Sequence, residues 1–272
     1  MSVKDLNLPT DRTIVMGILN VTPDSFADGG RYQTTASAIE RGLVMLEEGA
    51  DIIDIGGEST RPGADRVDVD EELARILPVV TVLAKAGAII SIDTKRAITA
   101  EKAISAGAQI VNDVSGGLSD SAMFSKVASL GCVYIAMHTR GDSQQMQSMA
   151  TYSDVVREVT EEISQRVTSA LNAGIKRDSL IVDPGLGFAK EAEDNWTLLA
   201  NLPALEELGF PVLVGASRKR FLGNLTGAQN PDDREAATIA LTHFLAQRGT
   251  WGVRVHSVKP HRDAIAVAGE LA

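Results

Sequence analysis

Short apolar runs alternate with longer amphipathic stretches from one end of the chain to the other. A continuous apolar run is typical of a parallel strand covered on both faces, and apolar residues that recur every three or four positions indicate a helix. Ile39, Leu43 and Leu46 recur in this way after the first run. We therefore predict strands at residues 14–19, 52–55, 88–92, 109–111, 133–137, 180–182, 212–215 and 252–256. We predict helices at residues 36–49, 70–86, 98–106, a stretch ending at 130, 153–173, 195–208, 232–247 and 261–271.

The regular alternation of these elements predicts an α/β fold with a parallel sheet. No composition break or low-complexity linker interrupts the eight strand–helix units, so we expect one domain over residues 1–272. Eight units predict a (β/α)8 TIM barrel, in which eight parallel strands are ringed by helices. An open doubly wound sheet is the alternative. It is less favoured because the first strand is not followed by G-x-G-x-x-G and both terminal strands are strongly apolar.

Composition narrows the classes of ligand and partner. The formal net charge of −10 and pI of about 4.9 argue against a general nucleic-acid or anionic-membrane surface, so an anionic ligand needs a local basic cluster. Cys132 is the only cysteine, which excludes an internal disulfide and fits a reducing cytosol. The first twelve residues are polar and no long uncharged apolar window occurs. We expect a soluble, cytoplasmic protein.

Polar residues stand where the predicted strands end. In a TIM barrel the ligand chemistry lies at the carboxyl ends of the strands, so these side chains should converge on one mouth. They are Asn20, Thr60, Asp93, Asn112, His138, Asp183, Lys219, Arg254 and His256.

Asp93, Asn112 and Asp183 form a first group. Carboxylates accept hydrogen bonds and an amide both donates and accepts, so the three suit a flat heterocycle that offers amino and ring N–H donors. Helix capping and turn formation at Asp93 and Asp183 are the alternative explanation.

Lys219, Arg254 and His256 form a second, basic group. Arg254 and His256 are two residues apart in a predicted strand, so their side chains point the same way. With Lys219 they could hold a diphosphate, and Asn20 could supply an oxygen to Mg²⁺. Residues 217–219 could instead be a solvated basic turn.

The loops after the first two strands are long and rich in glycine and proline. Such loops in a compact domain are more often functional than idle, and these could fold over a second substrate and exclude water. The alternative is a plain surface loop. The candidate residues are Phe26, Asp28, Ser59, Thr60, Arg61 and Pro62.

Three other polar residues call for an expectation. Asp54 stands among apolar neighbours and is expected to be a hydrogen-bonded carboxylate inside the barrel. His138 ends a strand and either lines the mouth or is structural. His261, at the start of the last predicted helix, is expected to be exposed.

Several motifs resemble the signatures of the dihydropteroate synthase family, and their phrasing is closest to actinobacterial members. The first is MGILNVTPDSF at residues 16–26 with DGG at 28–30, and the second is DIGGESTRPGA at residues 54–64. SIDT (91–94), VND (111–113), DPGLGF (183–188), GASRK (215–219) and RVH (254–256) continue the match in order. The resemblance covers essentially the whole chain.

This resemblance implies a homodimeric (β/α)8 enzyme of folate biosynthesis. The reaction joins 6-hydroxymethyl-7,8-dihydropterin diphosphate to 4-aminobenzoate with Mg²⁺, and sulfonamides compete for the aminobenzoate site. By resemblance, the pterin is held by Asp93, Asn112, Asp183 and Lys219. The metal and diphosphate are handled by Asn20, Thr60, Arg254 and His256, with Asn20 as the metal ligand and Arg254, His256 and Lys219 as the catalytic group. The aminobenzoate is bordered by Phe26, Ser59, Thr60, Arg61, Pro62, Phe188 and Ser217.

Ser257 is one departure, because family members often carry Asp after the histidine. If that Asp orients the imidazole, His256 would be less well held here. A pterin-binding methyltransferase module and a non-catalytic pterin-binding paralogue remain alternatives. Neither needs the Lys219, Arg254 and His256 group together with the two long loops.

Overall fold

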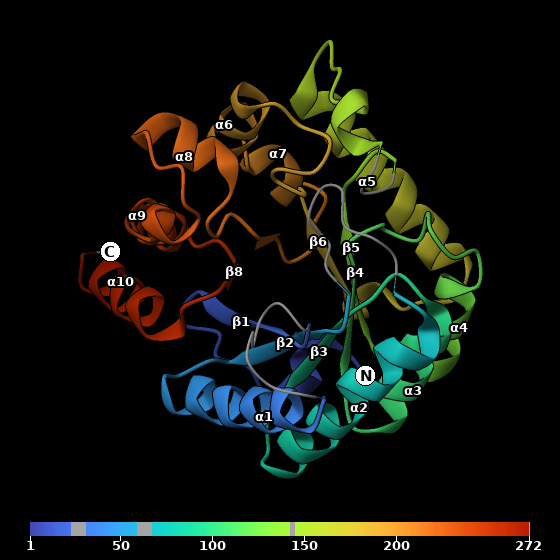
Figure 1. Ribbon diagram of the computed structural model, residues 1–272. Helices are drawn as coiled ribbons and strands as arrows, with labels where there is room; N and C mark the ends of the chain where they lie inside the picture. Colours follow the sequence, from blue (N-terminus) through green and yellow to red (C-terminus); the bar gives the residue numbers. More distant parts are fainter. Residues whose placement is uncertain (23–30, 59–66, 142–144, 272) are drawn as a thin grey trace.

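The computed structural model describes residues 1–22, 31–58, 67–141 and 145–271. Its eight parallel strands form one sheet in the order β6-β5-β4-β3-β2-β1-β8-β7. A parallel bridge between Val182 and Val212 joins the two ends of this order, so the sheet curls into a nearly closed barrel (Figure 1). The strands are β1 (Ile14–Asn20), β2 (Ile52–Gly56), β3 (Ile90–Asp93), β4 (Ile110–Asp113), β5 (Val133–Met137), β6 (Leu180–Asp183), β7 (Leu213–Val214) and β8 (Gly252–Val255).

Helices ring the barrel on its outside, so the predicted (β/α)8 architecture is confirmed (Figure 1). They are α1 (Arg31–Glu47), α2 (Val69–Lys85), α3 (Ala97–Ser105), α4 (Met123–Leu130), α5 (Val155–Asn172), α6 (Ala192–Ala200), α7 (Pro203–Glu206), α8 (Arg220–Thr226), α9 (Glu235–Gln247) and α10 (Val258–Glu270). Short 3-10 turns are η1 (Val3–Leu6), η3 (Met146–Met149), η4 (Arg177–Ser179) and η5 (Asp232–Arg234).

The helix prediction was wrong in four places. The first helix begins at Arg31 rather than at residue 36. The single helix expected at 195–208 is two helices, because the chain breaks at Asn201 and restarts with Pro203, which is favoured in a first helical turn. The short α8 was not predicted, although Gly227 ends it in the left-handed conformation that suits glycine. The last helix begins at Val258 rather than at residue 261.

Two sets of apolar side chains form the core. The larger set lies between strands and helices. The smaller set points into the barrel from the amino-terminal part of the strands, and Leu6 of η1 joins it with Trp251 packed alongside. A fully buried Ile or Leu side chain contributes about 1.5–3 kcal/mol of stability. The inner set therefore stabilises the barrel and fills its amino-terminal end with apolar side chains. Its strand members are Ile14, Met16, Ile52, Ile110, Val133, Ile135, Ile181 and Leu213.

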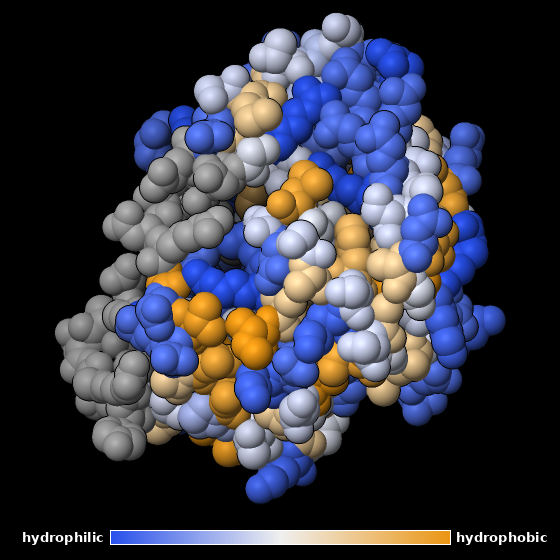
Figure 2. Space-filling view, turned by 90° about the vertical axis from the view of Figure 1, so that its right-hand side faces the viewer, coloured by the Kyte–Doolittle hydropathy of each residue, from blue (hydrophilic) through white to orange (hydrophobic). Residues whose placement is uncertain are grey.

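No helix among the described residues is long and apolar enough to cross a membrane. Figure 2 shows the side of the molecule that lies at the right of Figure 1, where α4 and α5 are found. Hydrophilic residues cover most of its upper part, and hydrophobic ones occur lower down in small groups.

Candidate active site

The inward-facing positions of the barrel change from apolar to polar toward the carboxyl ends of the strands. Side chains of a strand point alternately to its two faces, so an inward Ile52 places Asp54 inward, and an inward Ile110 places Asn112 inward. The sheet register puts Asp93 directly beside Asn112. The inward polar layer comprises Asp54, Asp93, Asn112, Asp183 and Arg254, with Gly215 following β7.

Arg254 lies at the centre of this layer. Its Nε donates to Asp54 Oδ2 over 2.6 Å, and its Nη2 donates to Asp93 Oδ2 over 2.7 Å. Asn112 Nδ2 donates to the same Asp54 oxygen over 3.0 Å. Asp54 is fully buried, as expected of an interior carboxylate. The two carboxylates therefore fix the plane of the guanidinium, since an Arg fork binds carboxylates in a defined geometry.

Some oxygen atoms on the Asp54 and Asp93 side of the layer have no hydrogen-bond partner among the described residues. Asp54 Oδ1 and Asp93 Oδ1 are buried and have no hydrogen-bond partner among the described residues, and the same holds for Ser91 Oγ. Burial raises the pKa of Asp93 to about 7, against the opposing effect of Arg254. Buried polar atoms are nearly always paired, so Asp93 Oδ1, at the end of β3, is the acceptor that a ligand with N–H donors would use.

Lys219 and Asp183 lie on either side of the space above Gly215. A Cβ atom added to Gly215 would be 3.6 Å from Asp183 Oδ2 and 3.8 Å from Lys219 Nζ. Lys219 also donates to the backbone oxygen of Leu186, and its Nζ is 4.6 Å from the centroid of the Phe188 ring. Burial lowers the pKa of Lys219 to about 8. Lys219, Asp183 and Phe188 thus border one space, and Gly215 keeps its floor open.

His256 is oriented by Ser217. The two side chains are joined by a 2.9 Å hydrogen bond between Ser217 Oγ and His256 Nδ1, and the backbone N–H of His256 donates to the same hydroxyl over 3.2 Å. Ser257 instead accepts a hydrogen bond of 2.9 Å from Arg218 Nη2. The imidazole therefore has a support that does not depend on an acid at position 257. Ser217 was predicted to border the aminobenzoate, and the described contacts place its hydroxyl on His256.

The turn at residues 217–219 is not a solvated basic turn. Arg218 Nε donates to Glu235 over 2.7 Å and its Nη1 also pairs with Asp232, so its charge is compensated. The left-handed backbone of Arg218, with φ of 59°, separates the directions of Arg218 and Lys219. Of the two basic residues in this turn, it is Lys219 that brings its charge to the space above Gly215.

Asn20 ends β1 at the same mouth. Its Oδ1 is 3.7 Å from the position that a Cβ on Gly56 would take, and Asp93 Cβ is 3.5 Å from that position. In the described part of the chain no three His, Cys, Asp or Glu side chains are grouped closely enough to hold a metal ion. A neutral oxygen donor without a carboxylate cage fits Mg²⁺ that is held mainly by substrate phosphates.

Six candidate residues belong to the loops after β1 and β2. Phe26, Asp28, Ser59, Thr60, Arg61 and Pro62 lie outside the described residues. Phe188 and Ser217 are therefore the two aminobenzoate candidates whose positions are known, and both lie close to Lys219 or His256.

Two further histidines are buried. His138 is buried, with Nε2 3.0 Å from Glu162 Oε2 and Nδ1 2.8 Å from Lys190 Nζ, and burial lowers its pKa to about 3. Its ring therefore faces α5 rather than the mouth. The exposure expected for His261 was wrong: this side chain is 0% exposed and bonds Thr242 and Glu235.

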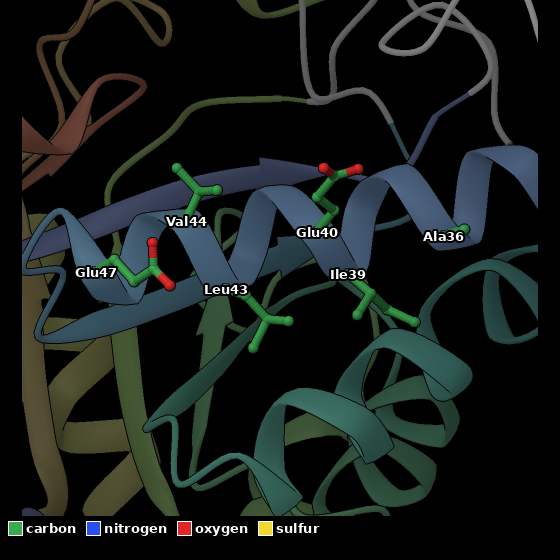
Figure 3. A pocket seen from close by; sticks show the side chains of 6 residues that line it. All are labelled: Ala36, Ile39, Glu40, Leu43, Val44 and Glu47. Carbon is green, nitrogen blue, oxygen red and sulfur yellow. The ribbon is translucent and has the colours of Figure 1, made fainter.

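A shallow apolar hollow on α1 is unrelated to this site. The side chains that line it project from successive turns of the one helix and do not converge (Figure 3). They include only two charged groups, Glu40 and Glu47, and none of the inward polar layer. A ligand site needs polar groups that converge, and the barrel mouth has them.

Residue reasoning alone missed three contributors. Gly215 was seen as part of a strand and not as the floor of the site. Asp54 was placed inside the barrel but not paired with Arg254. Lys190 was not singled out, although a lysine among the glycines of DPGLGFAK is an unusual residue to bury.

Comparison with known proteins identifies the family. A family model described as pterin binding enzyme matches residues 16–256. A dihydropteroate synthase of Mycobacterium leprae is 51% identical over 261 residues, which are 94% of this chain and 92% of that protein. A solved structure of Xanthomonas albilineans dihydropteroate synthase with 4-aminobenzoic acid is 45% identical, with a TM-score of 0.90 over 96% of this chain and 94% of the other. Another from that organism, in complex with 7,8-dihydropteroate, is 42% identical, with a TM-score of 0.88 over 97% and 95%. The chain belongs to the dihydropteroate synthase family of pterin binding enzymes.

Proposed function

We propose that this protein condenses 6-hydroxymethyl-7,8-dihydropterin diphosphate with 4-aminobenzoate to give 7,8-dihydropteroate and diphosphate. One observation carries the proposal: the same barrel mouth holds spare carboxylate acceptors at Asp93 and a basic group formed by Lys219, Arg254 and His256. The solved relatives that contain 4-aminobenzoic acid and 7,8-dihydropteroate support this choice of substrates.

The pterin is assigned to the acidic side of the mouth. Asp93 and Asp183 accept hydrogen bonds from its amino and ring N–H groups, and Asn112 offers both a donor and an acceptor. Lys219 donates from the opposite side of the space above Gly215. Because these groups are buried, hydrogen bonds to them discriminate strongly against rings that lack the matching donors.

The diphosphate is assigned to the basic side. Arg254 and His256 donate to its oxygens, and they stabilise the charge that gathers there as the bond between the pterin methylene carbon and oxygen breaks. The electron pair of that bond leaves with the diphosphate. The amine of 4-aminobenzoate forms the new C–N bond and releases one proton. An arylamine is nucleophilic when neutral, so the site needs no strong general base.

Mg²⁺ would be held by Asn20 together with oxygens of the substrate, and when bound it neutralises charge on the departing diphosphate. Phe188 and Ser217 border the aminobenzoate, and the sequence adds Phe26, Ser59, Thr60, Arg61 and Pro62. This is where sulfonamides would compete. We extend the proposal to a homodimer in the cytoplasm, for which light scattering and cell fractionation are the tests.

The decisive experiment is a turnover assay with the pterin diphosphate, 4-aminobenzoate and Mg²⁺. Diphosphate release is followed, and the condensed product is identified by mass. Dihydropteroate that disappears when the metal is chelated supports the proposal. Binding of a pterin without diphosphate release would overturn it in favour of a pterin-binding methyltransferase module or a non-catalytic paralogue.

A further inference from the structure

The segment between β6 and α6 carries Phe188 and the Leu186 carbonyl to the site, and its backbone is unusual. Gly185, Gly187 and Ala189 all have positive φ, at 63°, 75° and 47°. For an alanine this conformation is strained and persists only where the surroundings hold it. A Cβ on Gly185 would come within 1.8 Å of the His138 carbonyl, so the segment lies directly against the end of β5. The segment therefore depends on contacts from outside itself.

Lys190 supplies those contacts from behind. Its Nζ donates to Gly185 O over 3.1 Å and to Phe188 O over 3.0 Å, and it lies 2.8 Å from His138 Nδ1. Burial lowers the pKa of Lys190 well below its ordinary value, but three acceptors match the three hydrogens of an ammonium group and stabilise that form. His138 Nδ1 is then the acceptor, so Nε2 carries the hydrogen that faces Glu162 Oε2 over 3.0 Å. Lys190 is 4% exposed and turned away from the barrel mouth by these bonds.

Lys219 meets the same segment from the front. It donates to Leu186 O, and its Nζ lies against the Phe188 ring. The segment is thus held between a lysine that faces the ligand space and a lysine that does not. Any shift of the Phe188 backbone moves the ring beside Lys219, and any shift of Leu186 O releases the lysine that we assign to the pterin.

We propose that Lys190 is a positioning residue for substrate recognition: by fixing the Gly185 and Phe188 carbonyls it sets the Phe188 ring and, through Leu186, the Lys219 ammonium. Lys190 touches neither substrate in this arrangement. The inference rests on the proposed function, since it concerns the substrates named there. It adds a residue whose effect passes through the backbone rather than through a contact with the ligand.

The test compares Lys190→Met with Lys190→Arg and with a control, Lys126→Met. Lys126 makes a part-exposed 3.0 Å pair with Glu101 on the outer helices. Calorimetry with 6-hydroxymethylpterin alone measures the pterin site without turnover. We expect Lys190→Met to weaken this binding about tenfold and Lys190→Arg less, because the arginine retains donors. Lys126→Met should bind as the parent does.

Steady-state kinetics separate positioning from a loss of folded protein. Lys190→Met should raise KM for 4-aminobenzoate several-fold while kcat changes less, whereas a mere loss of active molecules lowers kcat and leaves both KM and pterin affinity unchanged. When Lys190→Met is added to Phe188→Ala, KM for 4-aminobenzoate should rise little further, because Lys190 acts on this substrate through the Phe188 ring. Unchanged pterin affinity in Lys190→Met, or fully additive effects with Phe188→Ala, would overturn the inference.

Lys190→Gln, which keeps an uncharged donor, replaces Lys190→Met if the latter does not fold, and the same criteria apply. The outcome is independent of the proposed reaction. A parent protein that binds pterin but forms no dihydropteroate overturns the proposed function, while the calorimetric comparison still decides the role of Lys190.

Discussion

Arg254 and Asp54, 200 positions apart in the sequence, are joined inside the barrel by a hydrogen bond of 2.6 Å between Nε and Oδ2. Asp93 accepts a hydrogen bond from Nη2 of the same guanidinium. The cation that we assign to the diphosphate is therefore oriented before any substrate arrives. Prior orientation of a cation lowers the reorganisation needed as charge develops on a leaving group.

Replacing Asp54 by Asn should loosen that orientation. The amide keeps the shape but removes the charge, so we expect a stability loss of about 1–3 kcal/mol and a fall in kcat/KM of about tenfold. Urea unfolding and kinetics with the pterin diphosphate measure the two effects. Asp51→Asn is the matched control. Asp51 also pairs with an arginine, Arg12, through hydrogen bonds of 2.6 and 2.8 Å, but this pair does not belong to the barrel mouth. Asp51→Asn should cost stability and leave the activity of the folded protein unchanged; equal activity losses in both variants would contradict the role given to Asp54.

Removing the guanidinium should have the larger effect on turnover. We expect Arg254→Ala to lower kcat/KM for the pterin diphosphate by about two to three orders of magnitude, because it deletes a charged donor to the leaving group. The variant also leaves Asp54 and Asp93 buried without their cation, so unfolding must be measured beside kinetics. Affinity for a bare pterin, which has no diphosphate, should fall far less. Near-normal kinetics would remove Arg254 from the diphosphate group.

The activity should decline at alkaline pH because of Lys219. Burial lowers its pKa to about 8, so its ammonium form is present below that pH and is lost as the pH rises through it. The profile of kcat/KM reports the free enzyme, and it should show a descending limb near pH 8. Lys219→Arg stays protonated and should lack this limb even if its overall activity is lower. A limb at the same pH in Lys219→Arg would assign it to another group.

Substitutions at Gly215 should show how much room the ligand needs. A Cβ there would be 3.6 Å from Asp183 Oδ2 and 3.9 Å from Arg254 Cβ, which is ordinary contact and not a clash. Gly215→Ala should therefore fold normally and raise KM for the pterin diphosphate modestly. Gly215→Val should fill the space and reduce kcat/KM by about a hundredfold, while thermal unfolding changes little. If the valine variant retained parental activity, the ligand would not lie above Gly215.

Ser217 and Ser257 offer a paired test of what holds His256. Ser217→Ala removes the hydroxyl bonded to Nδ1, and we expect kcat/KM to fall about tenfold since one oriented donor loses its support. Ser257→Ala loses a bond to Arg218, which keeps Glu235, so its effect should be about twofold or less. NMR of the His256 ring should show greater mobility in the first variant. The reverse order of effects would return the orienting role to position 257.

Much of the fold was predictable because most strands are short apolar runs, and β1, β3, β4 and β6 each end at a polar residue. Once the barrel is assumed, the alternation of side chains along β4 and β6 suffices to point Asn112 and Asp183 inward. The partner of Arg254 was not predictable in this way. Asp54 and Asp93 meet it because β8 pairs with β1 in the same sheet as β2 and β3, and that pairing of the last strand with the first is not evident from the spacing of any one strand.

His261 illustrates a different limit. Its neighbours Pro260 and Arg262 are polar or helix-starting residues, so exposure was a reasonable prediction. The ring is buried because α10 packs on α9, where Thr242 and Glu235 satisfy both of its nitrogens. Burial of a polar group is decided by partners that are distant in sequence, and local pattern does not reveal them.

Backbone pairing around the barrel is weakest between β6 and β7. Pro211, which lacks an N–H, precedes β7, and the single Val182–Val212 bridge is the pairing between β6 and β7. Asp183 ends β6, and Lys219 follows β7. A pterin bound by both Asp183 and Lys219 would link β6 to β7. Substrate binding should then slow amide hydrogen exchange in β6 and β7 more than in β2 and β3. The barrel would be stabilised by its substrate at the place where its own strand pairing is weakest.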